Sequence, residues 1–149
     1  MSSPNSFFPC IDILVVDDEA ELASLLAQFL RRQGYVVEQM NHSRSAMEFL
    51  TEHWVRLIIS DIFMPGGDGI ELLNFLRRRE PRPPLVAMSG TDDRFDGMLK
   101  LASVLGAART LTKPFDPTQL LVIVHELIGP PTKAASVEPF AFPQAWRGH

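Results

Sequence analysis

Five residues with reactive or charged side chains stand at the ends of four short apolar runs. They are Asp17, Asp18, Asp61, Ser89 and Lys113, and the runs before them cover residues 11–16, 55–60, 85–88 and 108–112. If the runs are strands of an open parallel sheet, these side chains meet in the crevice beyond the strands' carboxyl ends. Three carboxylates in one place repel one another, so the cluster needs a cation. The hydroxyl and the ammonium suit a phosphate-like ligand.

Helical patterns separate the strand-like runs, which predicts an α/β protein with helices on both faces of a parallel sheet. A poorer strand is expected at residues 35–40. With the four runs above it makes five strands, each followed by a helix. The chain of 149 residues suits one domain, and 46% hydrophobic residues suffice for its core.

Start and stop signals delimit the expected helices. The first has an apolar face from Leu22 to Leu30 and stops at Gly34. The second runs to residue 52 from a serine cap, either Ser43 or Ser45, with Ser45 and Glu48 spaced as a capping box.

The remaining helices have comparable signals. The third is expected over residues 70–79, before a proline-rich turn. The fourth starts at Asp92 or Asp93 and stops before Gly106. The last has Asp116 as N-cap, Pro117 at its first position and Gly129 after its end.

Composition narrows the class of protein. Fourteen basic and eighteen acidic residues leave a net charge of −4, which argues against a dedicated DNA- or RNA-binding surface. The single Cys10 excludes an internal disulfide framework and fits a reducing compartment. No stretch has the pattern of a signal peptide or the length of a membrane span. We therefore expect a cytoplasmic protein without membrane insertion.

Four stretches resemble the receiver domain of two-component response regulators, in the same order along the chain. They are residues 15–19 (VVDDE), 60–69 (SDIFMPGGDG), 88–90 (MSG) and 112–115 (TKPF). Any one of these stretches is common in proteins, but the occurrence of all four, each at the end of a strand-like run, is a specific signal for this family. The resemblance covers about residues 11–128. It implies a flavodoxin-like (βα)5 fold, a doubly wound parallel five-stranded sheet in the order 2-1-3-4-5.

The resemblance implies a magnesium site. Asp18 and Asp61 would bind Mg²⁺ directly, Asp17 through water, and the backbone carbonyl of Phe63 would add a further oxygen. Hard oxygen ligands are those that Mg²⁺ prefers.

The resemblance also implies phosphoryl chemistry. Asp61 would be the phosphoacceptor, since a carboxylate that attacks a phosphoryl group forms an aspartyl phosphate. Ser89 and Lys113 would contact phosphoryl oxygens, and Lys113 would pair with Asp61 when no phosphate is present. In the family a cis peptide before Pro114 aims the lysine.

Two positions bear on the family's switch. Thr110 stands where the family often has Tyr or Phe, so no ring can swing inward there. Phe63 stands at a position that flanks the acyl phosphate in the family. Its ring has no hydrogen-bonding group to orient a hydrolytic water and would occlude the water's approach, so we expect it to prolong the phosphorylated state. Arg77, Arg78 and Arg79, with Arg82, are read as a solvated helix end that suits the macrodipole.

These features predict a stand-alone receiver at residues 11–129, with an N-terminal extension at 1–10 and a disordered tail at 130–149. It would take a phosphoryl group from a histidine kinase or a histidine phosphotransfer protein and signal through contacts with a further protein. The kinase, the downstream protein and the oligomeric state stay open.

Two alternatives remain. A haloacid-dehalogenase-like phosphohydrolase also uses an Asp nucleophile, Ser or Thr, Lys and Mg²⁺, but it typically has a second Asp where this chain has Phe63. A receiver-like scaffold that is never phosphorylated would not need the charge cluster.

Overall fold

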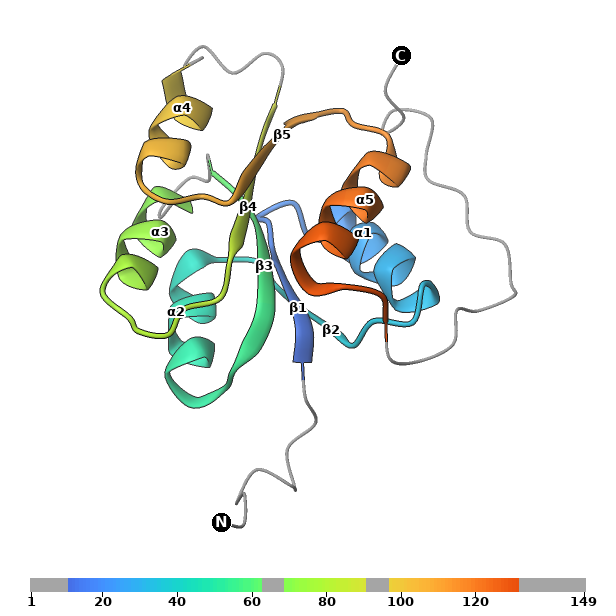
Figure 1. Cartoon of the computed structure of the whole chain (residues 1–149), viewed down its shortest axis with the longest axis horizontal. Helices are drawn as coiled ribbons and strands as arrows, with labels where there is room; N and C mark the ends of the chain where they lie inside the picture. Colours follow the sequence, from blue (N-terminus) through green and yellow to red (C-terminus); the bar gives the residue numbers. More distant parts are fainter. Residues whose placement is uncertain (1–10, 63–68, 91–96, 132–149) are drawn as a thin grey trace.

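The computed structural model describes residues 11–62, 69–90 and 97–131. Strands and helices alternate along the chain (Figure 1). The strands are β1 (Ile11–Val16), β2 (Val37–Met40), β3 (Val55–Asp61), β4 (Leu85–Gly90) and β5 (Arg109–Lys113). The helices are α1 (Ala20–Arg32), α2 (Ser43–Glu52), α3 (Gly69–Arg77), α4 (Gly97–Val104) and α5 (Pro117–Ile128). All strand pairs are parallel, in the order β2-β1-β3-β4-β5. The predicted fold is confirmed.

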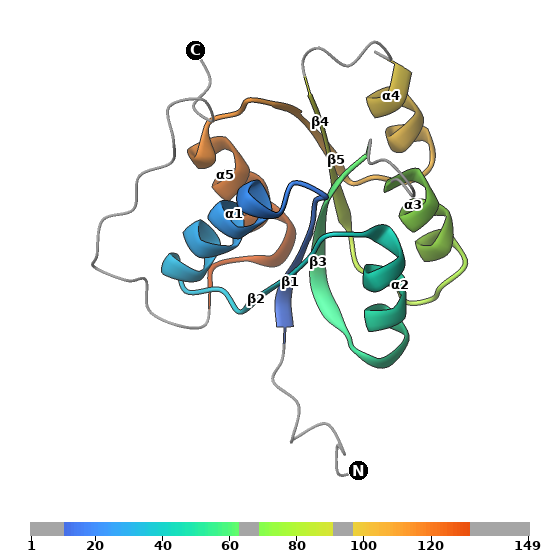
Figure 2. The same cartoon turned by 180° about the vertical axis from the view of Figure 1, so that it is seen from behind.

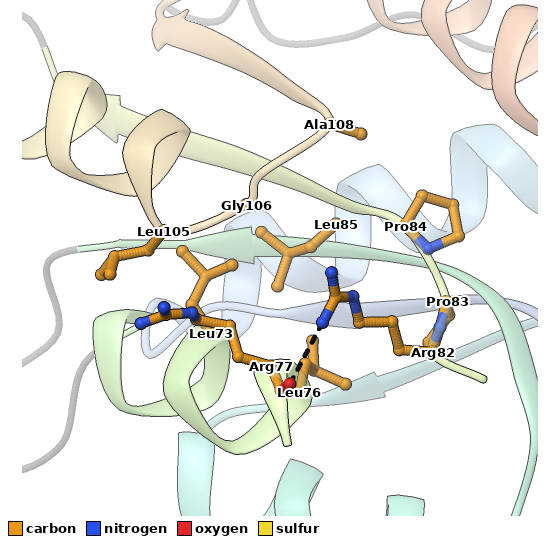
Figure 3. A pocket seen from close by; sticks show the side chains of 10 residues that line it. All are labelled: Leu73, Leu76, Arg77, Arg82, Pro83, Pro84, Leu85, Leu105, Gly106 and Ala108. Carbon is orange, nitrogen blue, oxygen red and sulfur yellow. Dashed lines mark hydrogen bonds between the residues drawn. The ribbon is translucent and has the colours of Figure 1, made fainter. Parts of the chain in front are cut away.

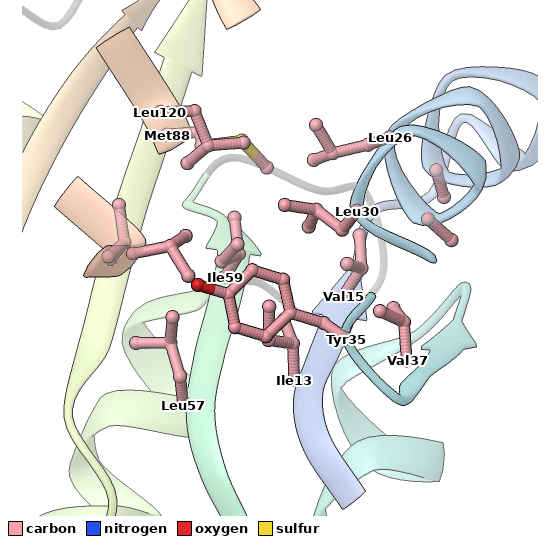
Figure 4. Close-up of a cluster of buried hydrophobic side chains, with 14 of the residues drawn as sticks. Ile13, Val15, Leu26, Leu30, Tyr35, Val37, Leu57, Ile59, Met88 and Leu120 are labelled. Carbon is pink, nitrogen blue, oxygen red and sulfur yellow. The ribbon is translucent and has the colours of Figure 1, made fainter. Parts of the chain in front are cut away.

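Helices cover both faces of the sheet. Figures 1 and 2 show α1 and α5 on one face and α2, α3 and α4 on the other. Side chains alternate between the faces along each strand. Thus Ile13 and Val15 of β1 belong to one buried cluster, while Leu14 and Val16 belong to the other. Figure 4 shows the first cluster, in which Leu26 and Leu30 of α1 pack toward the sheet. Strands buried on both faces read as continuous apolar runs, which is why the sequence revealed them.

Several expected helix signals are present. The backbone of Gly34 has φ 109° just after α1, and that of Gly106 has φ 110° after α4. The side chain of Asp116 accepts a hydrogen bond from the backbone N–H of Thr118 at 2.9 Å, so Asp116 is the N-cap of α5. Gly129 ends α5 with φ 79°.

The predicted cap of α2 is wrong. His42 is the N-cap residue and no side chain caps this helix, so the serine cap and the Ser45–Glu48 capping box do not form. The reason is that Ser43 already lies inside the helix and is buried, which leaves its hydroxyl unable to serve as the cap. The start predicted for the fourth helix at Asp92 or Asp93 lies outside the described residues.

Two predicted elements are shorter than expected. β2 begins at Val37 rather than at Tyr35. The N–H of Tyr35 instead bonds the carbonyl of Leu30 at 3.2 Å and completes the turn after α1, while the N–H of Val36 bonds the Asp12 carboxylate at 2.8 Å. α3 ends at Arg77.

A polar cluster ties the end of α5 to the amino-terminal edge of the sheet. Arg56 forms an ion pair with buried Asp12 at 3.2 Å and donates to the carbonyl of Ile128 at 2.5 Å. The hydroxyl of Tyr35 donates to the carbonyl of Gly129 at 2.7 Å. Segments far apart in the sequence therefore meet here. Within the described ranges, no helix combines the length and apolar character needed to cross a bilayer.

Candidate functional site

Strand register brings the predicted site residues to one edge of the sheet. Val16 of β1 pairs with Ser60 of β3, and the next residues along these two strands are Asp17 and Asp61. Asp61 in turn pairs with Met88 of β4, directly before Ser89. Ser89 pairs with Thr112 of β5, directly before Lys113. Four neighbouring strands thus deliver the polar residues side by side, as the sequence predicted.

Three carboxylates form a candidate metal centre. Oxygen atoms of Asp17, Asp18 and Asp61 all lie within 4.8 Å of one another. Asp17 is 1% exposed and Asp61 is 6% exposed, whereas Asp18 is half-buried. The N–H of Glu19 donates to Asp17 at 3.0 Å and helps to fix its orientation. Clustered carboxylate oxygens are hard ligands, so this donor set fits Mg²⁺.

Lys113 bridges two of these carboxylates. Its ammonium lies 2.8 Å from an oxygen of Asp17 and 3.2 Å from an oxygen of Asp61. The contact with Asp61 was expected, but the shorter one with Asp17 was not. The Lys113–Pro114 peptide is cis. One ammonium balances one of the three carboxylate charges, which leaves the site negative and open to a further cation.

Burial and like charge both act on Asp18. Partial desolvation, followed by the adjacent Asp17 charge, raises the pKa of Asp18 above its ordinary value. For Lys113, burial alone would lower the pKa of the ammonium. The carboxylates of Asp17 and Asp61 outweigh burial and raise the pKa of Lys113, so this side chain stays charged at neutral pH.

The rest of the site is described in part. Ser89 is buried at the end of β4, and the following Gly90 is exposed with open space where a Cβ would lie. Phe63, proposed as a backbone ligand, lies outside the described residues. Thr110 is exposed on β5.

Sequence reasoning missed Gly69. A Cβ at this position would lie 2.4 Å from the carbonyl oxygen of Asp61 and 2.8 Å from the Cα of Ile62. The Gly69 N–H also donates to the carbonyl of Ile62 at 2.9 Å. The start of α3 therefore packs directly on the backbone of the phosphoacceptor candidate, which only a residue without a side chain permits. A glycine at the last position of the 60–69 stretch was the available signal.

Comparisons with known proteins agree with this geometry. The family model described as the response regulator receiver domain matches residues 13–125. The receiver domain of NtrX from Brucella abortus superposes with a TM-score of 0.72 at 29% identity, over 78% of this chain and 98% of that one. A signal receiver domain from Bermanella marisrubri gives a TM-score of 0.73 at 30% identity, over 80% and 99%.

Curated relatives are longer than this chain. The alkaline phosphatase synthesis transcriptional regulatory protein PhoP of Bacillus subtilis is 36% identical over 116 residues, which cover 78% of this chain and 48% of PhoP. The phosphoglycerate transport system transcriptional regulatory protein PgtA of Salmonella typhimurium is 29% identical, over 78% of this chain and 28% of PgtA. The chain spans half or less of the length of these two relatives.

Proposed function

The chain belongs to the response regulator receiver domain family of two-component systems, and from this premise we propose that Asp61 accepts a phosphoryl group in a Mg²⁺-dependent reaction. The donor would be a histidine kinase or a histidine phosphotransfer protein, as receiver domains of response regulators take phosphoryl groups from histidine kinases. We propose residues 11–129 as the receiver unit and the cytoplasm as its location.

One observation carries this proposal. Lys113 contacts both Asp17 and Asp61, within a trio of carboxylates at the carboxyl edge of the sheet. A carboxylate beside a cation site and a charged lysine has what phosphoryl transfer requires, namely a nucleophile and positive charge for the phosphoryl oxygens.

The proposed step is a displacement at phosphorus. An oxygen of Asp61 forms a bond to phosphorus while the bond from phosphorus to the donor's imidazole nitrogen breaks, and its electron pair remains on that nitrogen. Lys113 exchanges its contact with Asp61 for a phosphoryl oxygen, and the Ser89 hydroxyl donates to another. Mg²⁺ would be held directly by Asp18, Asp61 and the backbone carbonyl of Phe63, and through water by Asp17, and it would supply further charge neutralisation.

The test is incubation with acetyl phosphate and Mg²⁺, followed by intact-protein mass measurement. We expect one phosphoryl adduct in the wild type and none in Asp61→Asn. Asp12→Asn is a matched control, because Asp12 is a buried carboxylate at the opposite edge of the sheet. It should label normally.

Other outcomes assign other functions. Hydrolysis of the donor without a lasting adduct would favour the phosphohydrolase. No reaction at all would favour the scaffold that is never phosphorylated. Full labelling of Asp61→Asn would move the phosphoacceptor to another residue.

The signal would leave through contacts with a downstream protein. Leu101 and Val104 of α4 and Val122 of α5 have exposed apolar side chains, Val104 by 81%. We propose α4, β5 and α5 as the surface that contacts the partner, since exposed apolar side chains suit a protein interface. Val104→Asp should weaken capture of the phosphorylated protein's partner without changing the adduct at Asp61.

A further inference from the structure

A basic surface lies at the amino-terminal edge of the sheet. Residues 77–82 carry four arginines and one glutamate in a chain whose net charge is −4. Arg77, Arg78 and Arg82 are exposed, and none of them forms an ion pair with a carboxylate of the described residues. The macrodipole of α3 suits cations in its last turn, but Arg82 lies beyond that turn. A solvated helix end therefore does not account for the whole cluster.

A first hollow of about 250 Å³ opens between the carboxyl ends of α3 and α4, beside the start of β4. Buried leucines line it, among them Leu73, Leu76 and Leu85. Figure 3 shows these leucines beside Arg77 and Arg82. The guanidinium of Arg82 donates a hydrogen bond to the backbone carbonyl of Arg77 at 3.1 Å. An apolar pocket is thus bordered by two cations.

A second hollow of about 480 Å³ adjoins the first and shares Leu76 and Pro83 with it. Trp54 lines it and is 52% exposed. Arg79 also lines it and is held in place, since its guanidinium lies 4.9 Å from the centre of the Phe75 ring. We call the two hollows, together with Arg77, Arg78, Arg79 and Arg82, the arginine groove.

We propose that the arginine groove docks an acidic segment of a partner protein, with one apolar side chain of that segment filling the first hollow. Guanidinium groups bind carboxylates in a bidentate manner. Each exposed ion pair contributes little, so the buried apolar side chain supplies most of the affinity. The arginines select acidic partners and speed their association.

Charge distinguishes this occupant from others. A second copy of the chain docked through the same surface would bring the two arginine clusters together, which is unfavourable. A nucleic acid duplex offers phosphates but has no side chain for a leucine-lined hollow. An acidic protein segment satisfies both the cations and the hollow.

The arginine groove is separate from the phosphoryl site. Arg82 precedes β4, whereas Asp61 ends β3 at the opposite edge of the sheet. The proposal therefore does not depend on phosphorylation, and the two functions can be tested apart.

The experiment is selection of a random peptide display library on the wild-type protein, followed by titration of the recovered peptides. We expect peptides with an excess of Asp and Glu around a Leu, Phe or Met. The variant R77E/R82E should bind them at least tenfold more weakly. The control R44E/K100E changes the same charge at two exposed positions elsewhere and should bind normally. R77E/R82E should keep its phosphoryl adduct, and Asp61→Asn should keep its peptide binding.

Several results would overturn the proposal. These are recovery of no peptide, recovery of peptides without acidic excess, or equal binding by R77E/R82E. Recovery of peptides rich in Phe and Pro, like residues 139–143, would assign the arginine groove to that segment of this chain instead. Self-association that R77E/R82E abolishes would assign the arginine groove to a second copy of the chain. Tight binding of duplex DNA would assign the groove to nucleic acid.

Discussion

At the scale of single residues, Lys113 balances the charge of the candidate metal centre. Its ammonium contacts Asp17 and Asp61, both largely buried. Removing one partner of a buried pair leaves an uncompensated charge and costs about 3 kcal/mol. We therefore expect Lys113→Met to lower the free energy of unfolding by roughly that amount without metal.

Added Mg²⁺ should restore more stability to Lys113→Met than to the wild type, because it replaces the lost positive charge. Urea denaturation with and without Mg²⁺ measures both effects. Lys100→Met is the control, since Lys100 is exposed on α4. An equal response of both variants to Mg²⁺ would place the metal elsewhere.

Asp18 should destabilise the metal-free protein at neutral pH. Because its folded pKa is raised, first by burial and then by Asp17, the ionised form is disfavoured in the folded state. The stabilising effect of a raised pKa is present below the unfolded value near 3.8 and is lost as pH rises through the folded value. Asp18→Asn should thus raise the free energy of unfolding at pH 7 by about 0.5 kcal/mol after solvent screening.

Thermal melting of Asp18→Asn and wild type at pH 7 and at pH 3, without Mg²⁺, measures this effect. The gain should disappear at the lower pH, where the carboxyl group is protonated in both states. With Mg²⁺ the order should reverse, since the variant lacks a ligand. A gain that is the same at both pH values would rule out charge repulsion as its cause.

At the scale of elements, the start of α3 fixes the end of β3. Gly69→Ala would place a Cβ against the Asp61 carbonyl, so α3 and β3 must move apart. Such overpacking costs about 2 kcal/mol. We also expect slower labelling of Asp61 by acetyl phosphate, measured by mass against time. Gly90→Ala, where the space is open, should change neither quantity.

The sequence predicted those elements whose signals are local. Asp116, Pro117 and Gly129 delimit α5 because capping depends on neighbours in the chain. The cap of α2 was mispredicted because tertiary packing buries Ser43. The contacts of Lys113 with Asp17 and of Arg56 with Asp12 join distant segments, so no local pattern reveals them. The site residues themselves could be predicted because parallel strands bring their carboxyl ends to one edge.

At the scale of the whole molecule, Tyr35 links the end of α1 to the end of α5. Its hydroxyl donates to the Gly129 carbonyl, and its ring lies edge-on to His125, with centroids 6.3 Å apart. Burial, followed by the charge of Asp12, raises the pKa of Tyr35 above 10.0, while Arg56 acts in the opposite direction. Tyr35→Phe loses one hydrogen bond, which is worth about 1 kcal/mol at pH 7.

The alkaline limb of the stability curve tests the Tyr35 contact. Above about pH 10 the unfolded tyrosine loses its proton while the folded one keeps it, so the wild type loses stability as pH rises. Tyr35→Phe lacks this group, and its deficit relative to the wild type should shrink above pH 10. Urea denaturation from pH 7 to 11 gives the comparison. A deficit that stays constant would mean that the phenol does not titrate as described.

The sheet order has a consequence for how the molecule opens. β1 and β3 have partners on both sides and are buried almost throughout, whereas β5 pairs with β4 alone and is largely exposed. Among β1, β3, β4 and β5, amide hydrogen exchange should therefore be slowest in Ile13–Val16 of β1 and fastest in Arg109–Lys113 of β5. Equal protection of β1 and β5 would contradict this. If exchange is fastest in β5, local opening of this edge strand frees Lys113, while Asp17 and Asp61 stay together at the ends of β1 and β3, which open last.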